Sequence, residues 1–186
     1  MSLFPPAVLS IAEIHEAIAA TRPDEECLIF REKRFTWNDM TLRTRQLANY
    51  LASQGLGCQT ERDSLLNWES GQDHLAIYLH NGNEYLECML GAFKGRVAPF
   101  NVNYRYVAEE LIYLLNDSSA SIIVYHSIFA PILESILPQV PLITMMLQVD
   151  DESGHDLLPG AMWYEDALLS SRADLPAPVR AGLRQR

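Results

Sequence analysis

The sequence predicts an α/β protein with a mostly parallel, open sheet and flanking helices. Between residues 75 and 149, short continuous apolar runs alternate with segments that have helical periodicity. Strands that are buried on both faces have such apolar runs, and roughly 10-residue helices between them are the usual crossovers of a parallel sheet. The chain has 186 residues, of which 48% are hydrophobic and 20% are charged. A chain of this size and composition buries a substantial core.

The N-terminal part predicts a short amphipathic helix from residue 11 to about residue 20. Ser10 and Glu13 have the spacing of a capping box, in which each residue satisfies a backbone N–H of the first turn. Three isoleucines, Ile11, Ile14 and Ile18, then fall on one helical stripe. We expect this stripe to face the core.

The next segment predicts a β-hairpin followed by a longer helix. The apolar runs 27–30 and 34–36 are separated by charged residues, which is typical of two short strands and a turn. Thr36 is expected to cap a helix with Asp39 in its first turn, and Gly55 is expected to end it.

Residues 57–72 show neither helical nor strand periodicity and are polar on balance. Glycines lie near both ends of this stretch, which favours a surface excursion. We expect its Trp68 to pack locally.

The regular part of the chain predicts four strands, joined by helices over about 84–93, 107–115 and 128–137. The strands correspond to the apolar runs 75–79, 97–102, 122–125 and 142–149. One more short helix is expected over residues 162–171. Residues 172–186 contain two prolines and four arginines, which predicts a linker or disordered tail behind one α/β subdomain of residues 1–171.

Charge and cysteine content exclude several classes of protein. The formal charge of −10 argues against nucleic-acid binding over a broad face, because such faces need Lys and Arg to replace counterions. Cys27, Cys58 and Cys88 are widely spaced and include no CxxC pair, so neither a disulfide framework nor a metal site is expected. No apolar run reaches the roughly 18 residues of a membrane span. These features predict a cytoplasmic protein.

The strand-to-helix loops are where an open parallel sheet binds ligands. The first loop, residues 80–83, lacks the G-x-G-x-x-G of a dinucleotide site, and Asn83 is expected to cap the helix that follows. Residues 91–96 superficially suggest a phosphate loop but lack its G-K-[ST] arrangement. They are interpreted as a helix end, where Lys94 and Arg96 meet the helix dipole.

Two histidines stand out because each ends a predicted parallel strand. His80 and His126 are therefore candidates for a ligand crevice, although a lone histidine at a strand end is more often a structural group. The acidic run 150–152 could bind a cation, but its ligand spacing is not that of a hard-ion site and solvation is the favoured interpretation.

Residues 98–106 form the most unusual connection, because they join a strand to a helix through two Asn, two Tyr and an Arg. These side chains suit a ligand site. The alternative is structural: Asn103 turns the chain, the tyrosines pack, and Arg105 pairs with Glu109 one helical turn later. The sequence alone leaves both interpretations open.

Three stretches together resemble a known family. They are residues 34–51, residues 76–85 (AIYLHNGNEY) and residues 99–117, which begin with PFNVNYRY. They resemble the start of the AMP-forming acyl-CoA synthetases, and the last stretch is similar to bacterial ligases for long-chain fatty acids or steroid side chains. The resemblance implies the N-terminal subdomain of the large domain. It also implies an ATP- and Mg²⁺-dependent enzyme that activates a carboxylic acid as an acyl-adenylate and passes it to CoA.

The resemblance also implies a division of labour along a longer chain. The Gly-rich phosphate loop of such enzymes is expected beyond residue 186, so the chain is predicted to be an N-terminal part without catalytic residues and inactive alone. Asn101, Asn103 and Arg105 become candidates for the wall of the CoA tunnel. The alternative is a free-standing α/β binding or dimerisation module. Homo-oligomerisation is possible, because uncovered apolar faces favour self-association.

Overall fold

The computed structural model of the protein describes residues 9–177. Its centre is a five-stranded sheet in the order β4-β3-β5-β6-β7, in which every neighbouring pair is parallel. The strands are β3 (His74–Tyr78), β4 (Ala98–Asn101), β5 (Ala120–His126), β6 (Met145–Val149) and β7 (Ala161–Trp163). The predicted class, an α/β protein with an open parallel sheet and flanking helices, is confirmed.

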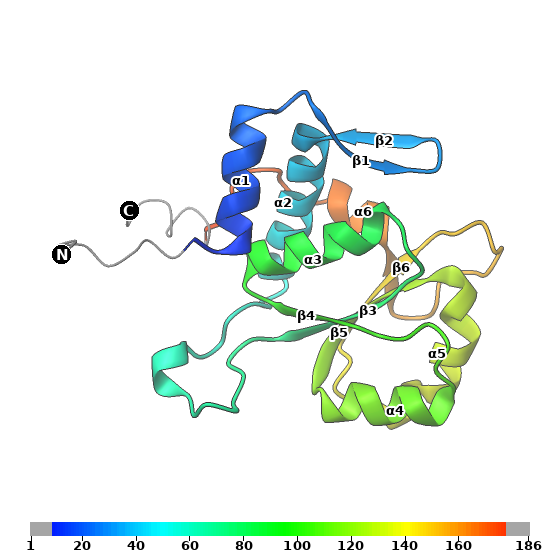
Figure 1. The fold of residues 1–186 in the computed structure, drawn as a ribbon. Coiled ribbons are helices and arrows are strands. Elements are labelled where there is room, and N and C mark those ends of the chain that lie inside the picture. Colours follow the sequence, from blue (N-terminus) through cyan, green and yellow to red (C-terminus); the bar gives the residue numbers. More distant parts are fainter. Residues whose placement is uncertain (1–8, 178–186) are drawn as a thin grey trace.

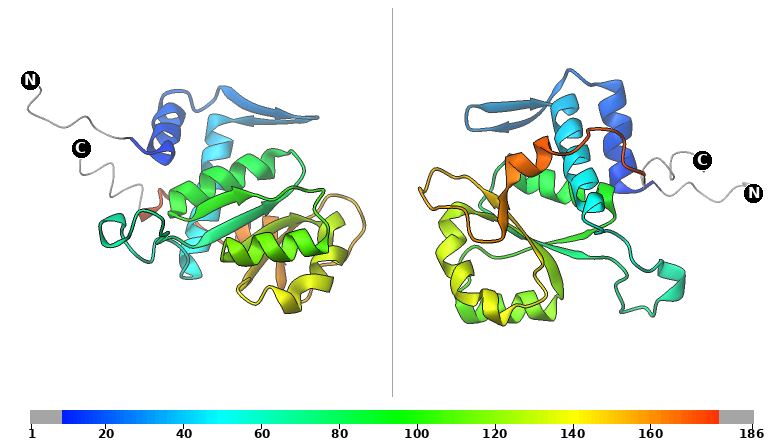
Figure 2. Two further views of the ribbon diagram at one scale, coloured as in Figure 1. Left: turned by 60° about the horizontal axis from the view of Figure 1, so that its bottom comes forward. Right: turned by 180° about the vertical axis from the view of Figure 1, so that it is seen from behind.

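Helices cover both faces of this sheet (Figure 1). One face carries α2 (Trp37–Ser53), α3 (Asn83–Gly95) and α6 (Tyr164–Leu169), with α1 (Ile11–Thr21) packed outside them. The other carries α4 (Ala108–Asp117) and α5 (Ala130–Ile136), and the 3-10 turns η2 (Ser127–Phe129) and η3 (Leu137–Gln139) flank α5. The two views in Figure 2 show the same layers, with the helices separated by the sheet.

A separate antiparallel hairpin, β1 (Glu26–Phe30) and β2 (Lys33–Thr36), precedes α2 and projects beyond the sheet. The predicted cap at Thr36 is present and forms a capping box, since the N–H of Asp39 donates to Thr36 Oγ1 at 3.1 Å and the N–H of Thr36 donates to Asp39 Oδ2 at 2.8 Å. This cap fixes the point at which the hairpin passes into α2.

Helix α1 is turned opposite to the prediction. Its buried positions are occupied by Ala12, Glu13, His15, Glu16 and Ala19, whereas Ile11 and Ile14 are 57% and 43% exposed. The physical reason is Glu16, which forms ion pairs with Lys94 and Arg45 at 2.6 Å each. A paired, buried carboxylate fixes the helix orientation more strongly than an isoleucine stripe that follows the usual pattern.

The stretch 91–96 is a packing element. A Cβ on Gly91 would lie 2.7 Å from Leu47 Cδ2, so a glycine is what lets α2 and α3 approach closely here. Lys94 lies in the last turn of α3, as expected for a helix end, and it is fully buried against Glu16. Arg96 ends α3 in the left-handed conformation (φ 59°) and pairs with Glu61 on the excursion.

Two local expectations are wrong. Trp68 does not pack locally: it is 81% exposed on the excursion, which holds the turn η1 (Arg62–Ser64) and is closed at its base by a bridge between Cys58 and Gln72. Asn83 does not cap α3, because Gly82 is the capping residue and the Asn83 amide instead donates to Glu87 Oε1 at 2.8 Å.

The C-terminal part differs from the expected helix over 162–171. It first forms β7 beside β6 and only then α6. The strand was not predicted because three residues are too few to show a periodicity in the sequence. The described start of the expected tail lies against α2, where Asn49 Nδ2 donates to the carbonyls of Arg172 and Asp174 at 2.8 and 2.9 Å. Residues 178–186 of that tail lie outside the described residues.

Candidate functional site

The carboxyl ends of β3, β5 and β6 open into a cleft of about 590 Å³. The tip of the β1–β2 hairpin forms its opposite wall. The cleft is lined from the sheet side by His80, Asn81, Glu84, His126, Ile128 and residues 149–153, and from the hairpin side by residues 30–33. A cleft at this edge is the usual ligand position in a parallel α/β sheet.

His80 and His126 lie together in this cleft, as neighbouring strand ends should. The backbone N–H of His80 donates to His126 Nδ1 at 2.9 Å, and the two ring centroids are 5.7 Å apart. Because Nδ1 accepts this bond, the neutral His126 ring carries its hydrogen on Nε2. Burial lowers the pKa of His126, although the carboxylates of Asp151 and Glu84 oppose the shift. His126 is therefore held as a neutral imidazole.

The acidic run has one member with a defined role. Asp151 Oδ2 accepts the backbone N–H of Ile128 at 3.1 Å, and Asp151 Oδ1 accepts that of Ser153 at 3.1 Å. Burial alone would raise the pKa of Asp151, but these hydrogen bonds outweigh it and the pKa is lowered. Asp151 thus fixes the loop after β6 against the turn after β5.

A second hollow of about 340 Å³ adjoins the cleft, and Lys33, Glu84, Val149 and Asp150 line both. The Lys33 Nζ lies 3.4 Å from Glu84 Oε1, so this ion pair joins the hairpin to the first turn of α3 between the two hollows. The far side of the second hollow is formed by residues 163–166 at the start of α6.

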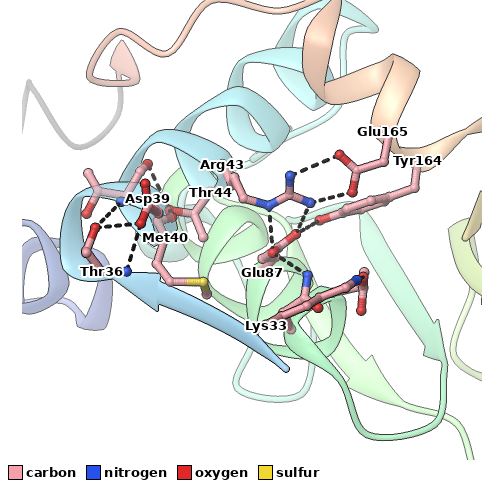
Figure 3. A network of polar contacts seen from close by, with 12 residues as sticks. Lys33, Thr36, Asp39, Met40, Arg43, Thr44, Glu87, Tyr164 and Glu165 are labelled. Atoms are coloured by element: carbon pink, nitrogen blue, oxygen red, sulfur yellow. Dashed lines mark hydrogen bonds and ion pairs between the residues drawn. The ribbon is translucent and has the colours of Figure 1, made fainter. Parts of the chain in front are cut away.

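A polar network lies behind the second hollow (Figure 3). Arg43 donates from Nε and Nη2 to both oxygens of Glu87 at 2.7 and 2.9 Å, and from Nη2 and Nη1 to both oxygens of Glu165 at 2.6 and 2.9 Å. The Tyr164 hydroxyl donates to Glu87 Oε2 at 3.0 Å. Glu87 is fully buried, so the network joins α2, α3 and α6 through charge that water does not screen.

Burial by itself would lower the pKa of Arg43, but the hydrogen bonds from its guanidinium to Glu165 and Glu87 outweigh that effect and raise it. Arg43 therefore stays charged. Its role is to hold the walls of the second hollow, because its donors are directed at carboxylates of the protein rather than into the hollow.

The loop after β4 lies beside the cleft at the edge of the sheet. The Tyr104 ring meets the His80 ring edge-on at a centroid distance of 4.9 Å. Asn103 Oδ1 accepts the backbone N–H of Arg105 at 3.0 Å, and the Arg105 guanidinium lies 5.3 Å from the centre of the Tyr104 ring. Asn101, Asn103 and Arg105 are exposed and do not line the cleft.

The structural alternative for this loop is met only in part. Asn103 does turn the chain, but within residues 9–177 Arg105 forms no ion pair with Glu109. The structure therefore brings His80, His126 and Tyr104 together. It leaves Asn103 and Arg105 on a separate, solvent-facing edge next to them.

Sequence reasoning missed the hairpin side of the cleft, where Arg31 and Lys33 lie, and it missed Glu84. The hairpin itself was expected, but its position over the sheet edge is a tertiary property. Its charged turn, residues 31–33, was the available signal.

Within the described part of the chain, no group of three or more His, Cys, Asp or Glu side chains is placed to hold a metal ion. In the same residues, no helix has the length and apolar character needed to cross a membrane.

Comparison with known proteins supports one family. The family described as AMP-binding enzyme matches residues 15–178. The chain belongs to this family. A similar curated relative is the medium-chain acyl-CoA ligase Mig of Mycobacterium avium, which is 51% identical over 171 residues. Another is the 3-oxocholest-4-en-26-oate–CoA ligase of Rhodococcus rhodochrous, which is 30% identical over 164 residues.

The matches include most of this AMP-binding family member but only a minor part of each relative. The match to Mig covers 92% of the chain but 31% of Mig, and the match to the Rhodococcus ligase covers 88% of the chain and 27% of that ligase. The chain thus spans about a third of the length of the relatives that it matches.

Solved structures of ligases have the same fold. The anthranilate CoA ligase AuaEII in complex with anthranoyl-AMP aligns with a TM-score of 0.75 at 17% identity, over 93% of this chain and 29% of that one. The N-terminal domain of FACL13 from Mycobacterium tuberculosis aligns with a TM-score of 0.72 at 20% identity, over 91% of this chain and 38% of that one. The predicted fold family, the N-terminal subdomain of an acyl-adenylate-forming ligase, is confirmed.

Proposed function

We propose that the chain forms the N-terminal part of an ATP-dependent acyl-CoA ligase that converts a carboxylic acid, through its adenylate, into a CoA thioester. The observation that carries this proposal is the 51% identity over 171 residues to the medium-chain acyl-CoA ligase of M. avium. The match covers 92% of the chain, so it is not confined to a single motif. The work of such an enzyme is expected in the cytoplasm, where ATP and CoA are available.

The proposed acid has a medium to long alkyl chain. The sequence interpretation favoured long-chain fatty or steroid-type acids, and a 30% identical relative is named for a steroid acid. The 51% identical relative is named for medium-chain acids instead, so we extend the proposed range to shorter chains.

The described residues offer a suitable group for CoA. Arg105 is exposed, lies over Tyr104 and, among the described residues, pairs with no carboxylate, so its guanidinium is available to a phosphate. Asn101 and Asn103 lie on the same edge with exposed side chains. We propose that this edge lines part of the CoA path.

ATP and Mg²⁺ are proposed to bind outside the described residues. The chain has no Gly-rich phosphate loop with a G-K-[ST] arrangement, and within residues 9–177 its carboxylates do not gather into a metal site. What this chain contributes to adenylation is the scaffold behind the cleft. We accordingly propose that the chain alone forms no acyl-CoA from octanoate, ATP and CoA.

A chimera tests the proposal directly. Residues 9–177 would replace the matching region of the M. avium ligase, and octanoyl-CoA formation would be measured. We expect the chimera to be active, because matched parts of one fold at 51% identity preserve their packing. A folded chimera without ligase activity would overturn the proposal and favour a free-standing binding module.

Arg105→Ala in the same chimera tests the CoA edge. We expect KM for CoA to rise about tenfold while KM for octanoate stays unchanged, since about 1.4 kcal/mol corresponds to a factor of ten. Arg62→Ala, on the distant excursion, is the matched control for loss of one exposed cation and should leave both constants unchanged.

A further inference from the structure

The hydrogen bond between His80 and His126 lies just beyond the end of the ladder that joins β3 and β5. The last paired residues of these two strands are Tyr78 and Tyr125. Two residues after Tyr78, the backbone N–H of His80 donates to the ring Nδ1 of His126 at 2.9 Å. A ring nitrogen thus takes the place that a backbone carbonyl has inside the ladder. The bond holds the loop 80–82, which leads into α3, to the end of β5.

This hydrogen bond depends on the protonation state of the His126 ring. A neutral imidazole accepts at one nitrogen, whereas an imidazolium donates from both. Protonation of His126 would therefore set a ring N–H against the backbone N–H of His80, and the bond would be lost. Because His126 is only 9% exposed, water cannot take over as acceptor unless the loop moves.

The protonated ring has another partner beside it. The carboxylates of Asp151, on the loop after β6, and Glu84, in the first turn of α3, favour the charged form of His126. His80 and Arg31 of the hairpin oppose it. The other charged groups that line the cleft are Glu32, Lys33, Asp150 and Glu152. His126 can thus accept from His80 when it is neutral, or face Asp151 as a cation when it is charged.

The two rings do not suit a metal ion, although their centroids are 5.7 Å apart. A metal needs a free lone pair on a ring nitrogen. Nδ1 of His126 already accepts from His80, and Nε2 of the neutral ring carries the hydrogen. In residues 9–177 no third ligand completes such a site. The pair is therefore a contact that responds to protons rather than a metal centre.

We propose that His126 is a pH-dependent latch, whose neutral ring holds the loop 80–82 to the end of β5 and whose protonated ring releases that loop and pairs with Asp151. Release changes a wall of the cleft, because His80 and Asn81 line it. The His80 ring also contacts Tyr104 on the loop after β4, at a centroid distance of 4.9 Å. A histidine with two alternative partners is a common trigger for such a switch.

The direction of the switch follows from proton linkage. Burial lowers the pKa of His126 from its ordinary value of 6.5 while the latch is closed. A ring that has left this position has a higher pKa, so protons bind preferentially to the released state. The latch is therefore closed above pH 6.5 and opens as the pH falls below it. The proposal does not depend on the ligase function, because it rests on contacts within the described residues.

NMR of the purified chain tests the latch, since the amide proton of residue 80 reports its own hydrogen bond. From about pH 7.5 to about pH 5 this proton should move upfield as the bond is lost. His126→Asn keeps an acceptor, because the amide Oδ1 takes roughly the place of Nδ1, and it does not titrate. The resonance should then stay fixed. His80→Phe is the matched control: it removes the neighbouring titration but keeps the backbone N–H, so the movement should persist.

The ring tautomer of His126 covers the case in which His126→Asn does not fold. In the parent chain with ¹⁵N-labelled histidine at about pH 7.5, the His126 ring should carry its hydrogen on Nε2. A hydrogen on Nδ1 would overturn the proposal. So would an amide proton of residue 80 that does not move with pH, the same movement in His126→Asn, or loss of the movement in His80→Phe.

Discussion

The two faces of the central sheet are built from different interactions. On the face that carries α1, α2, α3 and α6, four charged side chains are at most 6% exposed: Glu13, Glu16, Glu87 and Lys94. The last three take part in ion pairs that join different helices. On the face that carries α4 and α5, the buried cluster consists of apolar and aromatic residues, and none of the ion pairs in the described part of the chain includes a residue of those helices.

This difference separates two ways of positioning a helix. An apolar face sets how deeply a helix packs but tolerates sliding and repacking, since hydrophobic contact has no direction. A buried ion pair also sets rotation, because only one orientation matches each charge with its partner. The charged face supports the cleft through Lys33–Glu84 and the Arg43 network, so the positions of the cleft walls depend on these pairs.

The largest effect is expected from Glu87→Ala on the charged face. It leaves Arg43 with Glu165 alone and removes the acceptor of both Tyr164 and Asn83. We expect the free energy of unfolding to fall by about 4 kcal/mol, as for other broken buried pairs. Urea unfolding measures this change. Glu61→Ala, which breaks the exposed pair with Arg96, should leave the midpoint nearly unchanged.

If Glu61→Ala were as costly as Glu87→Ala, burial would not be what distinguishes the two pairs.

On the apolar face, Leu115→Ala is the corresponding change. Leu115 is 1% exposed, and its truncation should cost about 3 kcal/mol through lost burial and a residual cavity. Leu115→Met keeps the volume and should cost less than about 1.5 kcal/mol. The same urea unfolding series would show whether shape alone decides on this face. If the methionine variant were as unstable as the alanine variant, the face would need specific contacts as the charged face does.

The difference between the faces also explains what could be predicted from the sequence. Leu111 and Leu115 on α4 follow a regular stripe and are buried as expected, and so are the apolar runs of β3 and β5. The isoleucines of α1 follow an equally clear stripe but face outward, because partners for Glu16 lie on α2 and α3, 29 and 78 positions further along the chain. Periodicity contains no information about such distant charge partners.

The candidate site follows the same rule. His80 and His126 could be placed at one edge because parallel strands end together. The hairpin residues Arg31 and Lys33 could not be placed there, since their position depends on how the hairpin leans over the sheet.

The charged face should also respond to pH through His15. Neither ring nitrogen of His15 has a hydrogen-bond partner among the described residues, and burial beside Lys94 lowers its pKa from 6.5 to about 4. The ring is neutral when folded but charged when unfolded between these values, so the unfolded state binds more protons there. Stability should therefore fall as the pH drops from 6.5 to 4, by about 2 kcal/mol after allowance for relaxation.

The variant His15→Phe isolates the contribution of His15 to this pH dependence. The other charged groups that face His15, namely Lys94, Glu16 and Arg45, stay in place in the variant, and so does His126 elsewhere. Thermal unfolding of both proteins over this pH range gives the comparison. The stability of the parent should fall relative to that of His15→Phe as the pH drops toward 4. Parallel curves would show that His15 does not titrate on unfolding.

The smallest expected effect concerns how the helices begin on the two faces. On the charged face, α2 starts with a complete capping box. On the apolar face, Val107 is the capping residue of α4. Its N–H donates to Glu110 Oε2 at 3.1 Å, but its side chain has no oxygen that could accept a hydrogen bond in return. Val107 is 55% exposed and has the extended backbone of a capping residue (φ −80°, ψ 172°), so Val107→Thr keeps the branched shape and adds an acceptor for the N–H of Glu110. We expect a gain of about 0.5 kcal/mol in the free energy of unfolding. Thr36→Ala in α2 is the reciprocal change and should cost about 1 kcal/mol. The control repeats Val107→Thr in the Glu110→Ala background. If the gain disappears there, the capping box itself stabilises the helix; if the gain remains, the intrinsic preference of threonine for this position explains it.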